Sequence, residues 1–142
     1  MSTTRVLFVC THNAARSQMA EAWLNLLGGD TFEAFSAGTQ PTKINPFTIQ
    51  VMEEVGAPMT GKRSKLLQEV LSGAYFDYVI TVCANADQEC PVVLTPNSKR
   101  LHWGFEDPSA ALGTDSEKLA RFREIRDQIK ARIEAWLKTH PG

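Results

Sequence analysis

The chain has 142 residues, 43% of them hydrophobic and 22% charged, a composition typical of a globular domain with a single core. Fifteen lysines and arginines against 16 aspartates and glutamates leave a formal net charge of −1, which argues against nucleic acid or an anionic membrane as an obligate partner. The apolar run from Val6 to Val9 is too short for a signal peptide or a membrane span. We therefore expect one domain over residues 1–142, cytoplasmic and monomeric.

Strand-like and helix-like segments alternate along the chain, with no repeat, low-complexity tract or linker. Buried-strand patterns occupy 5–9, 32–36, 78–82 and 100–103. The third of these, YVITV, is the richest in β-branched residues and is expected at the centre of the sheet. This alternation predicts an α/β fold in three layers, a four-stranded parallel sheet with helices on both faces.

Each expected helix is marked by a start or stop signal. The signals are, in chain order, Arg16 and Gly28 for a first helix, Asn45-Pro46 for a second, Gly73 after a short third helix over 64–71, and Thr114 with Glu117 before a long closing helix. Apolar residues at helical spacing give the closing helix a buried face. They are Leu119, Phe122, Ile125, Ile129, Ile133 and Trp136.

Three segments that could carry chemistry follow the ends of predicted strands. Cys10 ends the first strand, Cys83 follows the third, and the segment after Trp103 follows the fourth. In parallel sheets of this kind, ligands bind beyond the carboxyl ends of the strands. The order of the elements therefore brings these three segments to one edge of the sheet.

The loop between the first strand and the first helix has the features of an oxyanion site. The start of a helix offers unpaired N–H groups and the positive end of the helix dipole. The loop consists of small or polar residues, whose backbone N–H groups can wrap an anion. They are Thr11, His12, Asn13, Ala14 and Ala15. Asn13 tolerates a left-handed conformation, and Arg16 can hold two oxygens of a tetrahedral anion.

The same positive field would stabilise a thiolate at Cys10, which makes this residue a candidate nucleophile at neutral pH. The Ser17 hydroxyl can add a hydrogen bond to the sulfur. Asp107, which precedes a proline beyond the fourth strand, can supply the proton that an oxygen leaving a tetrahedral oxyanion requires. By itself, an Asp-Pro pair more often marks a turn.

Two further cysteines, Cys83 and Cys90, need a separate explanation. Three cysteines in a reducing compartment do not describe a disulfide framework, and a spacing of seven does not suit a structural zinc site. Seven residues of helix would separate the two Cα atoms by roughly 10.5 Å, whereas a disulfide needs them within about 7 Å. The segment between them must therefore be a loop, or must unwind when the two sulfurs bond.

The motifs VLFVCTHNAARSQMAEAWL, SAGT at Ser36–Thr39 and Asp107-Pro108 resemble those of the low-molecular-weight phosphotyrosine phosphatase fold. More closely, nearly the whole chain is similar to the thioredoxin-coupled arsenate reductases of that fold. The resemblance implies Cys10 as nucleophile, and Arg16 with the loop amides as ligands of arsenate and related oxyanions such as phosphate and sulfate. It also implies Asp107 as general acid. Ser17 would support the thiolate, and Asn13 and Ser36 would hold the loop.

The resemblance also implies a relay through the three cysteines, which would serve arsenic detoxification. Cys10 attacks arsenate, Cys83 attacks the Cys10 sulfur as arsenite leaves, and Cys90 attacks Cys83. The intermediate disulfide is Cys10–Cys83 and the final one is Cys83–Cys90, which reduced thioredoxin opens. Glutathione or mycothiol remains an alternative reductant. No tightly bound cofactor is expected.

A low-molecular-weight protein-tyrosine or aryl phosphatase using Cys10, Arg16 and Asp107 is the competing enzyme. Phosphatases of this fold carry a second cysteine where Ala15 stands, and a tyrosine after Asp-Pro where Ser109 stands. We therefore expect phosphatase activity only as a slow side reaction. A redox-sensing or oxyanion-binding module is the competing non-enzyme.

Some related reductases bind potassium near the loop through residues that match Asn13, Ser36 and Glu21, with an acidic residue further on. Here that acidic position falls on Lys65. One hypothesis is that the Lys65 ammonium replaces the metal by pairing with Glu21, because two adjacent cations would repel. The alternative is a solvated lysine. His12 and His102 are interpreted as structural.

Overall fold

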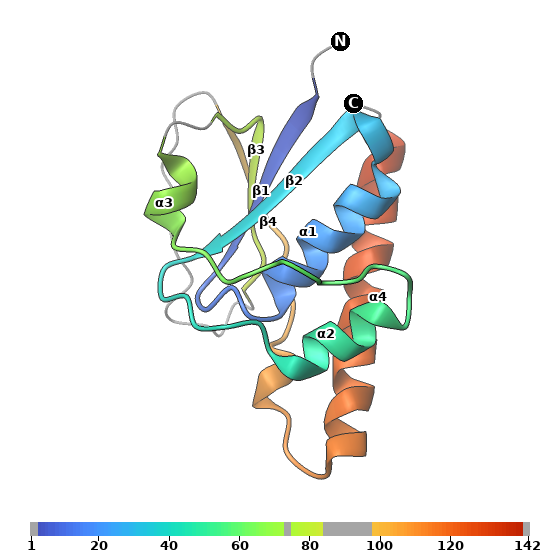
Figure 1. Ribbon diagram of the computed structural model, residues 1–142. Coiled ribbons are helices and arrows are strands. Elements are labelled where there is room, and N and C mark those ends of the chain that lie inside the picture. Colours follow the sequence, from blue (N-terminus) through green and yellow to red (C-terminus); the bar gives the residue numbers. More distant parts are fainter. Residues whose placement is uncertain (1–2, 73–74, 84–97, 141–142) are drawn as a thin grey trace.

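The computed structural model describes residues 3–72, 75–83 and 98–140. It contains the predicted four-stranded parallel sheet, in the order β2-β1-β3-β4 (Figure 1). The strands are β1 (Thr4–Cys10), β2 (Phe32–Gly38), β3 (Tyr78–Thr81) and β4 (Lys99–His102). The expected central position of the third strand is confirmed, because β3 pairs with β1 on one side and with β4 on the other.

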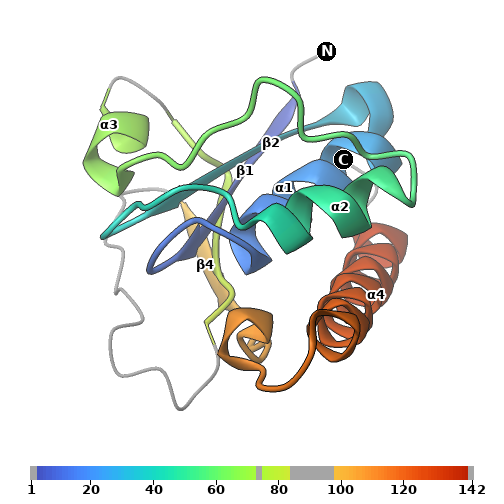
Figure 2. The ribbon, with the colours of Figure 1, turned by 60° about the horizontal axis from the view of Figure 1, so that its bottom comes forward.

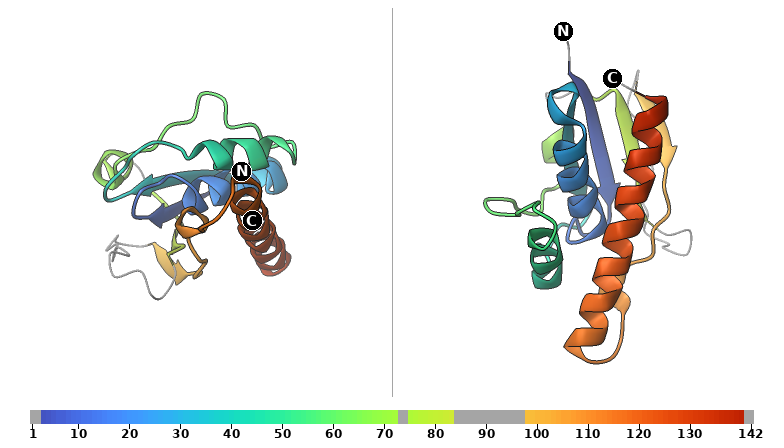
Figure 3. Two further views of the ribbon diagram at one scale, coloured as in Figure 1. Left: turned by 90° about the horizontal axis from the view of Figure 1, so that it is seen from below. Right: turned by 90° about the vertical axis from the view of Figure 1, so that its right-hand side faces the viewer.

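The helices form the other two layers. They are α1 (Arg16–Leu27), α2 (Pro46–Glu53), α3 (Leu67–Leu71) and α4 (Asp115–Thr139), with short 3₁₀ helices η1 (Gly29–Thr31) and η2 (Pro108–Ala110). α4 runs along the molecule beside α1, and α2 packs on α4 (Figure 3). The larger core cluster lies under these three helices, and a smaller one lies between the opposite face and α3. The predicted three-layer architecture is confirmed.

Two helix starts are capped as their sequences predict. The Asn45 side chain accepts a hydrogen bond from the Phe47 N–H at 2.9 Å, with Pro46 in the first turn of α2. At the start of α4, Thr114 and Glu117 each bind the backbone of the other in a complete capping box. The predicted apolar face of α4 is buried from Phe122 onward, so the cap and the stripe together place this helix.

The third helix is shorter than expected. It begins at Leu67, because residues 64 and 65 have no regular structure and Leu66 is extended. Leu66 forms a parallel bridge with Gly38 at the end of β2, and the Gly38 N–H donates to the Lys65 carbonyl at 2.9 Å. Pairing with the sheet edge thus replaces the first helical turn. Gly73, the expected stop, lies outside the described residues.

The strands run in parallel, so their carboxyl ends lie at the same edge, which Figure 2 brings forward. Cys10 is the last residue of β1, and the Val82 N–H, next to Cys83, donates to the Val9 carbonyl at 3.0 Å. The segment from Trp103 to Asp107 leaves β4 at the same edge. None of the described helices has the length and apolarity to cross a membrane.

Candidate active site

The Cys10 thiol lies almost buried at the base of the loop that joins β1 to α1. Its Sγ lies 2.9 Å from the Ser17 Oγ and accepts the Asn13 N–H at 3.3 Å. No side-chain hydrogen bond caps the start of α1 at Ala15, and N–H groups at the start of a helix can bind an anion. A negative sulfur at this position would meet hydrogen-bond donors and the positive end of a helix.

Asn13 organises this loop. It is the single non-glycine residue with a positive φ (51°) among those the structure describes. Its Nδ2 donates to the Ser17 Oγ at 2.8 Å, and its Oδ1 accepts from Gln18 Nε2 and from the Lys65 N–H, both at 2.9 Å. Its carbonyl accepts from the Ser64 Oγ at 2.8 Å. These bonds offset the cost of the left-handed conformation.

The other side of the loop lies against residues that follow β2. A Cβ at Gly38 would come within 2.4 Å of the Thr11 carbonyl oxygen, so this close approach requires glycine. The Gln40 N–H donates to that carbonyl at 2.9 Å, and the Thr42 N–H donates to the His12 carbonyl at 3.2 Å. The loop therefore has a defined shape before any anion enters.

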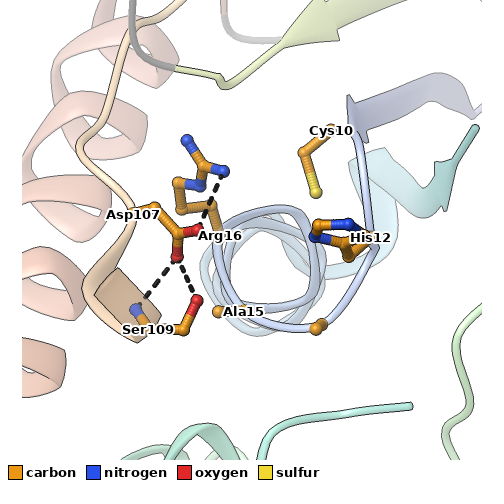
Figure 4. A pocket seen from close by; sticks show the side chains of 7 residues that line it. Cys10, His12, Ala15, Arg16, Asp107 and Ser109 are labelled. Carbon is orange, nitrogen blue, oxygen red and sulfur yellow. Dashed lines mark hydrogen bonds and ion pairs between the residues drawn. The ribbon is translucent and has the colours of Figure 1, made fainter. Parts of the chain in front are cut away.

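Arg16 and Asp107 form the opposite wall of the pocket (Figure 4). The Arg16 side chain is buried, its Nη1 donates to the Phe105 carbonyl at 3.1 Å, and its Nη2 lies 3.7 Å from the Asp107 Oδ2. The pocket is lined by Cys10, His12, Ala14, Ala15, Arg16, Asp107 and Ser109. A thiol, a guanidinium and a carboxyl thus face one small space, an arrangement suited to displacing oxygen from a tetrahedral anion.

Glu21 carries an ionic cluster next to this loop. The Lys65 ammonium lies 3.7 Å from the Glu21 Oε1, and the Lys62 ammonium lies much closer, 2.6 Å from Oε2. Ser36 donates to Oε1 at 2.9 Å. Burial lowers the pKa of Lys65 from its ordinary value, although Glu21 opposes this shift. Lys65 is therefore not a solvated lysine, but Lys62 makes the shorter contact.

This cluster does not fit a potassium ion. Both oxygens of the buried Glu21 carboxylate already have an ammonium neighbour, and a third cation would be repelled by both lysines. In the part of the chain that the structure describes, no group of three His, Cys, Asp or Glu side chains is placed to hold a metal.

The second cysteine, Cys83, follows a strand next to the one that ends in Cys10. Cys83 is fully buried directly after β3, the strand that pairs with β1. Cys90 lies outside the described residues, so the expected relation between Cys83 and Cys90 stays a prediction. His102, on β4, lies with its Nδ1 2.6 Å from the Thr81 Oγ1, a contact within the sheet.

Several residues of the site have no sequence signal of their own. Gln18 and Ser64 hold Asn13, Lys62 pairs with Glu21, and Ser109 contacts Asp107. Gln18 could have been found from its place in the first turn of α1. Lys62 and Ser64 lie in a segment without periodicity, which only the fold brings to the loop.

Comparison with known proteins agrees with this geometry. Residues 5–140 match the model of the low molecular weight phosphotyrosine protein phosphatase family. The arsenate reductase of Oceanobacillus iheyensis is 41% identical over 98% of this chain and 99% of its own, and that of Bacillus subtilis is 39% identical over the same shares.

Solved structures show the same likeness. An arsenate reductase in the phosphate-binding state superposes with a TM-score of 0.77 at 32% identity, over 96% of this chain and 98% of its own. The thioredoxin-dependent arsenate reductase of Corynebacterium glutamicum gives 0.72 at 32% identity, over 96% and 61%. A low molecular weight protein tyrosine phosphatase from T. tengcongensis gives 0.74 at 25% identity, over 96% and 99%.

Proposed function

Because the chain belongs to the low molecular weight phosphotyrosine protein phosphatase family, and its full-length relatives include arsenate reductases, we propose that it reduces arsenate to arsenite with electrons from thioredoxin. One observation carries this proposal. A buried cysteine, Cys83, follows the strand that pairs with the Cys10 strand, so a second sulfur lies at the sheet edge from which the anion loop leaves. A phosphatase has no use for that sulfur, whereas a reductase requires one.

The first step is a displacement at arsenic. The loop amides and Arg16 hold the oxyanion, and the Cys10 thiolate attacks arsenic while one arsenic–oxygen bond breaks. Asp107 gives its proton to the departing oxygen, which leaves as water. For HAsO₄²⁻ the product is a Cys10–S–AsO₃²⁻ adduct. No electrons have yet been transferred to arsenic.

The second step is the reduction. A Cys83 thiolate attacks the Cys10 sulfur, the new S–S bond forms, and the electron pair of the breaking S–As bond goes to arsenic, which leaves as arsenite. Cys90 then attacks Cys83, which frees the Cys10 thiolate and leaves a Cys83–Cys90 disulfide. Reduced thioredoxin restores the two thiols. No tightly bound cofactor or metal takes part, and the Glu21 cluster supplies its own cations.

We place this activity in a single monomeric domain over residues 1–142, in the cytoplasm, where thioredoxin keeps thiols reduced. In that compartment it would serve arsenic detoxification.

Hydrolysis of aryl phosphates is the second candidate function, and the shared anion loop favours it as a slow side activity. Water, instead of Cys83, would then release a Cys10 phosphate. The pocket has Ala15 within the loop and Ser109 after Asp107-Pro108, and its described lining contains no Phe, Tyr or Trp against which a tyrosine ring could pack. Small oxyanions suit this space better than aryl esters.

The deciding experiment follows arsenate turnover with thioredoxin, thioredoxin reductase and NADPH. Cys83→Ser is expected to abolish multiple turnovers while it leaves p-nitrophenyl phosphate hydrolysis largely intact, because only the reduction needs the second sulfur. Cys90→Ser is expected to stop after one turnover, with a Cys10–Cys83 disulfide found by peptide mapping. Equal loss of both reactions in Cys83→Ser would contradict the relay. If glutathione or mycothiol supports turnover and thioredoxin does not, the relay is kept and only the proposed electron donor changes.

A further inference from the structure

The carboxyl group of Asp107 is held by the turn that follows it. The Ser109 N–H donates to the Asp107 Oδ1 at 2.9 Å, and the Ser109 hydroxyl donates to the same oxygen at 2.5 Å. Asp107 caps the short helix η2, whose first residue is Pro108. One carboxyl oxygen therefore receives two hydrogen bonds from one residue.

The second carboxyl oxygen has a different environment. Oδ2 lies 3.7 Å from the Arg16 Nη2, on the side of the pocket where the guanidinium and the Cys10 sulfur face the same space (Figure 4). The two oxygens of Asp107 are thus inequivalent. Oδ1 is turned toward its own turn, and Oδ2 is turned toward the position where an anion would bind.

This difference decides where the acidic proton sits. A carboxyl oxygen has two lone pairs, and at Oδ1 both face donors from Ser109. A proton on Oδ1 would have to displace one of those hydrogen bonds. A proton on Oδ2 displaces neither and points into the pocket.

We propose that Ser109 is a positioning residue for the displacement step: by holding Oδ1 it makes Oδ2 the proton donor and aims it at the departing oxygen. The inference rests on the proposed function, in which Asp107 is the acid. In that step the S–As bond forms and an As–O bond breaks. The proton moves from Asp107 Oδ2 to the departing oxygen, and water leaves.

Removing the Ser109 hydroxyl leaves its backbone N–H as the remaining described donor to Oδ1. The carboxyl plane can then turn about the Cβ–Cγ bond, out of the orientation in which Oδ2 faces the pocket, so the proton is aimed correctly for only part of the time. Loss of one hydrogen bond corresponds to about a three- to tenfold change. Since the anion is held by the loop and Arg16, this loss is expected in kcat, with KM nearly unchanged.

The test compares Ser109→Ala and Ser109→Thr, each alone and combined with Asp107→Asn, in the coupled arsenate assay. Ser109→Ala is expected to lower kcat about three- to tenfold, and Ser109→Thr, which keeps a hydroxyl, to restore it. In the Asp107→Asn background Ser109→Ala should cost nothing further, because its effect acts through the carboxyl. Ser116→Ala, which removes an exposed serine hydroxyl at the start of α4, is the matched control.

Two outcomes would overturn the proposal: an equal loss from Ser109→Ala with and without Asp107→Asn, or a loss that appears in KM alone. If the wild type fails to reduce arsenate, the proposed function fails, and the same variants are then compared on p-nitrophenyl and phenyl phosphate. Phenyl phosphate, whose leaving oxygen needs the proton more, should show the larger loss.

A measurement without turnover completes the test. In crystals of Ser109→Ala soaked with inorganic phosphate, the Asp107 carboxyl is expected to leave its wild-type orientation. An unchanged orientation would overturn the proposal whatever the protein's activity.

Discussion

The two walls of the pocket are held in different ways. On the Cys10 side the loop is buried, and Asn13 is bonded to Lys65, which lies 52 residues away in the sequence. On the Asp107 side the carboxyl is partly exposed, and its two shortest hydrogen bonds come from Ser109, two residues further on. Cys10, the proposed nucleophile, is thus positioned by the tertiary fold, and Asp107, the proposed acid, by a local turn.

Because of this difference, changes in the two walls should affect the free energy of unfolding and the turnover rate differently. A change in the loop wall breaks buried hydrogen bonds, so it should lower the free energy of unfolding together with the turnover rate. A change at Asp107 or Ser109 breaks no buried hydrogen bond and should lower the rate alone.

The strongest test of the loop wall is Asn13→Ala. It removes the side-chain bonds to Ser17, Gln18 and Lys65 and places alanine at φ 51°. The expected loss is about 4 kcal/mol in the free energy of unfolding, measured in urea, because buried donors lose their partners and the backbone is strained. Arsenate turnover should fall in folded protein as well.

Asn13→Gly separates the cost of the lost hydrogen bonds from the cost of the backbone strain. Glycine relieves the backbone strain but not the lost bonds, so it should recover about 1 kcal/mol of the stability and little of the activity. Full recovery of both would mean that the hydrogen bonds do not hold the loop.

Lys62→Met extends the comparison to the Glu21 cluster. The buried carboxylate keeps only Lys65 among its two described ammonium neighbours, at 3.7 Å, and we expect a loss of about 3 kcal/mol in the free energy of unfolding. Lys43→Met, at an exposed lysine, is the control and should change stability by less than about 0.5 kcal/mol.

The free energy of unfolding also tests whether potassium binds at the Glu21 cluster. Wild-type stability is expected to be the same in KCl and NaCl of equal ionic strength. A wild-type protein that potassium specifically stabilises would contradict the view that the two lysines occupy this site.

Asp107→Asn tests the other wall. Asparagine can still accept the Ser109 N–H and cap η2, so stability should change by less than about 0.5 kcal/mol, whereas kcat should fall about 100-fold for want of a proton donor. Both quantities are measured on the same preparation. A large loss of stability would show that this turn supports the fold and would remove the contrast.

The smallest effect is expected far from both walls. Hydrogen bonds from Arg123, with help from Arg126, lower the pKa of Glu54 from 4.5 to about 2. This carboxylate therefore contributes stability above about pH 4.5 and loses that contribution as the pH falls toward 2. Solvent screening limits the contribution to about 1 kcal/mol. Glu54→Gln should flatten that part of the stability curve while leaving turnover at neutral pH unchanged.

Local sequence patterns were sufficient to predict most of the fold. Alternating segments predicted the parallel sheet, Asn45 and Thr114 marked the helix starts, and the family resemblance is confirmed by a match over residues 5–140. The prediction was wrong at residues 64–66, where Leu66 and Lys65 bind Gly38 instead of opening α3. Helix propensity over a few residues cannot reveal that a sheet edge lies alongside.

The sequence by itself determined that Cys10, Asn13, Arg16 and Ser17 share one strand–loop–helix junction, because these residues are neighbours and their spacing follows from backbone geometry. Only the tertiary structure decided that Lys62 pairs with Glu21 across 41 residues, and that Ser64 reaches Asn13 across 51. Such contacts depend on where the chain returns after crossing the sheet. No periodicity in residues 62–66 encodes that position, and only the packed core establishes it.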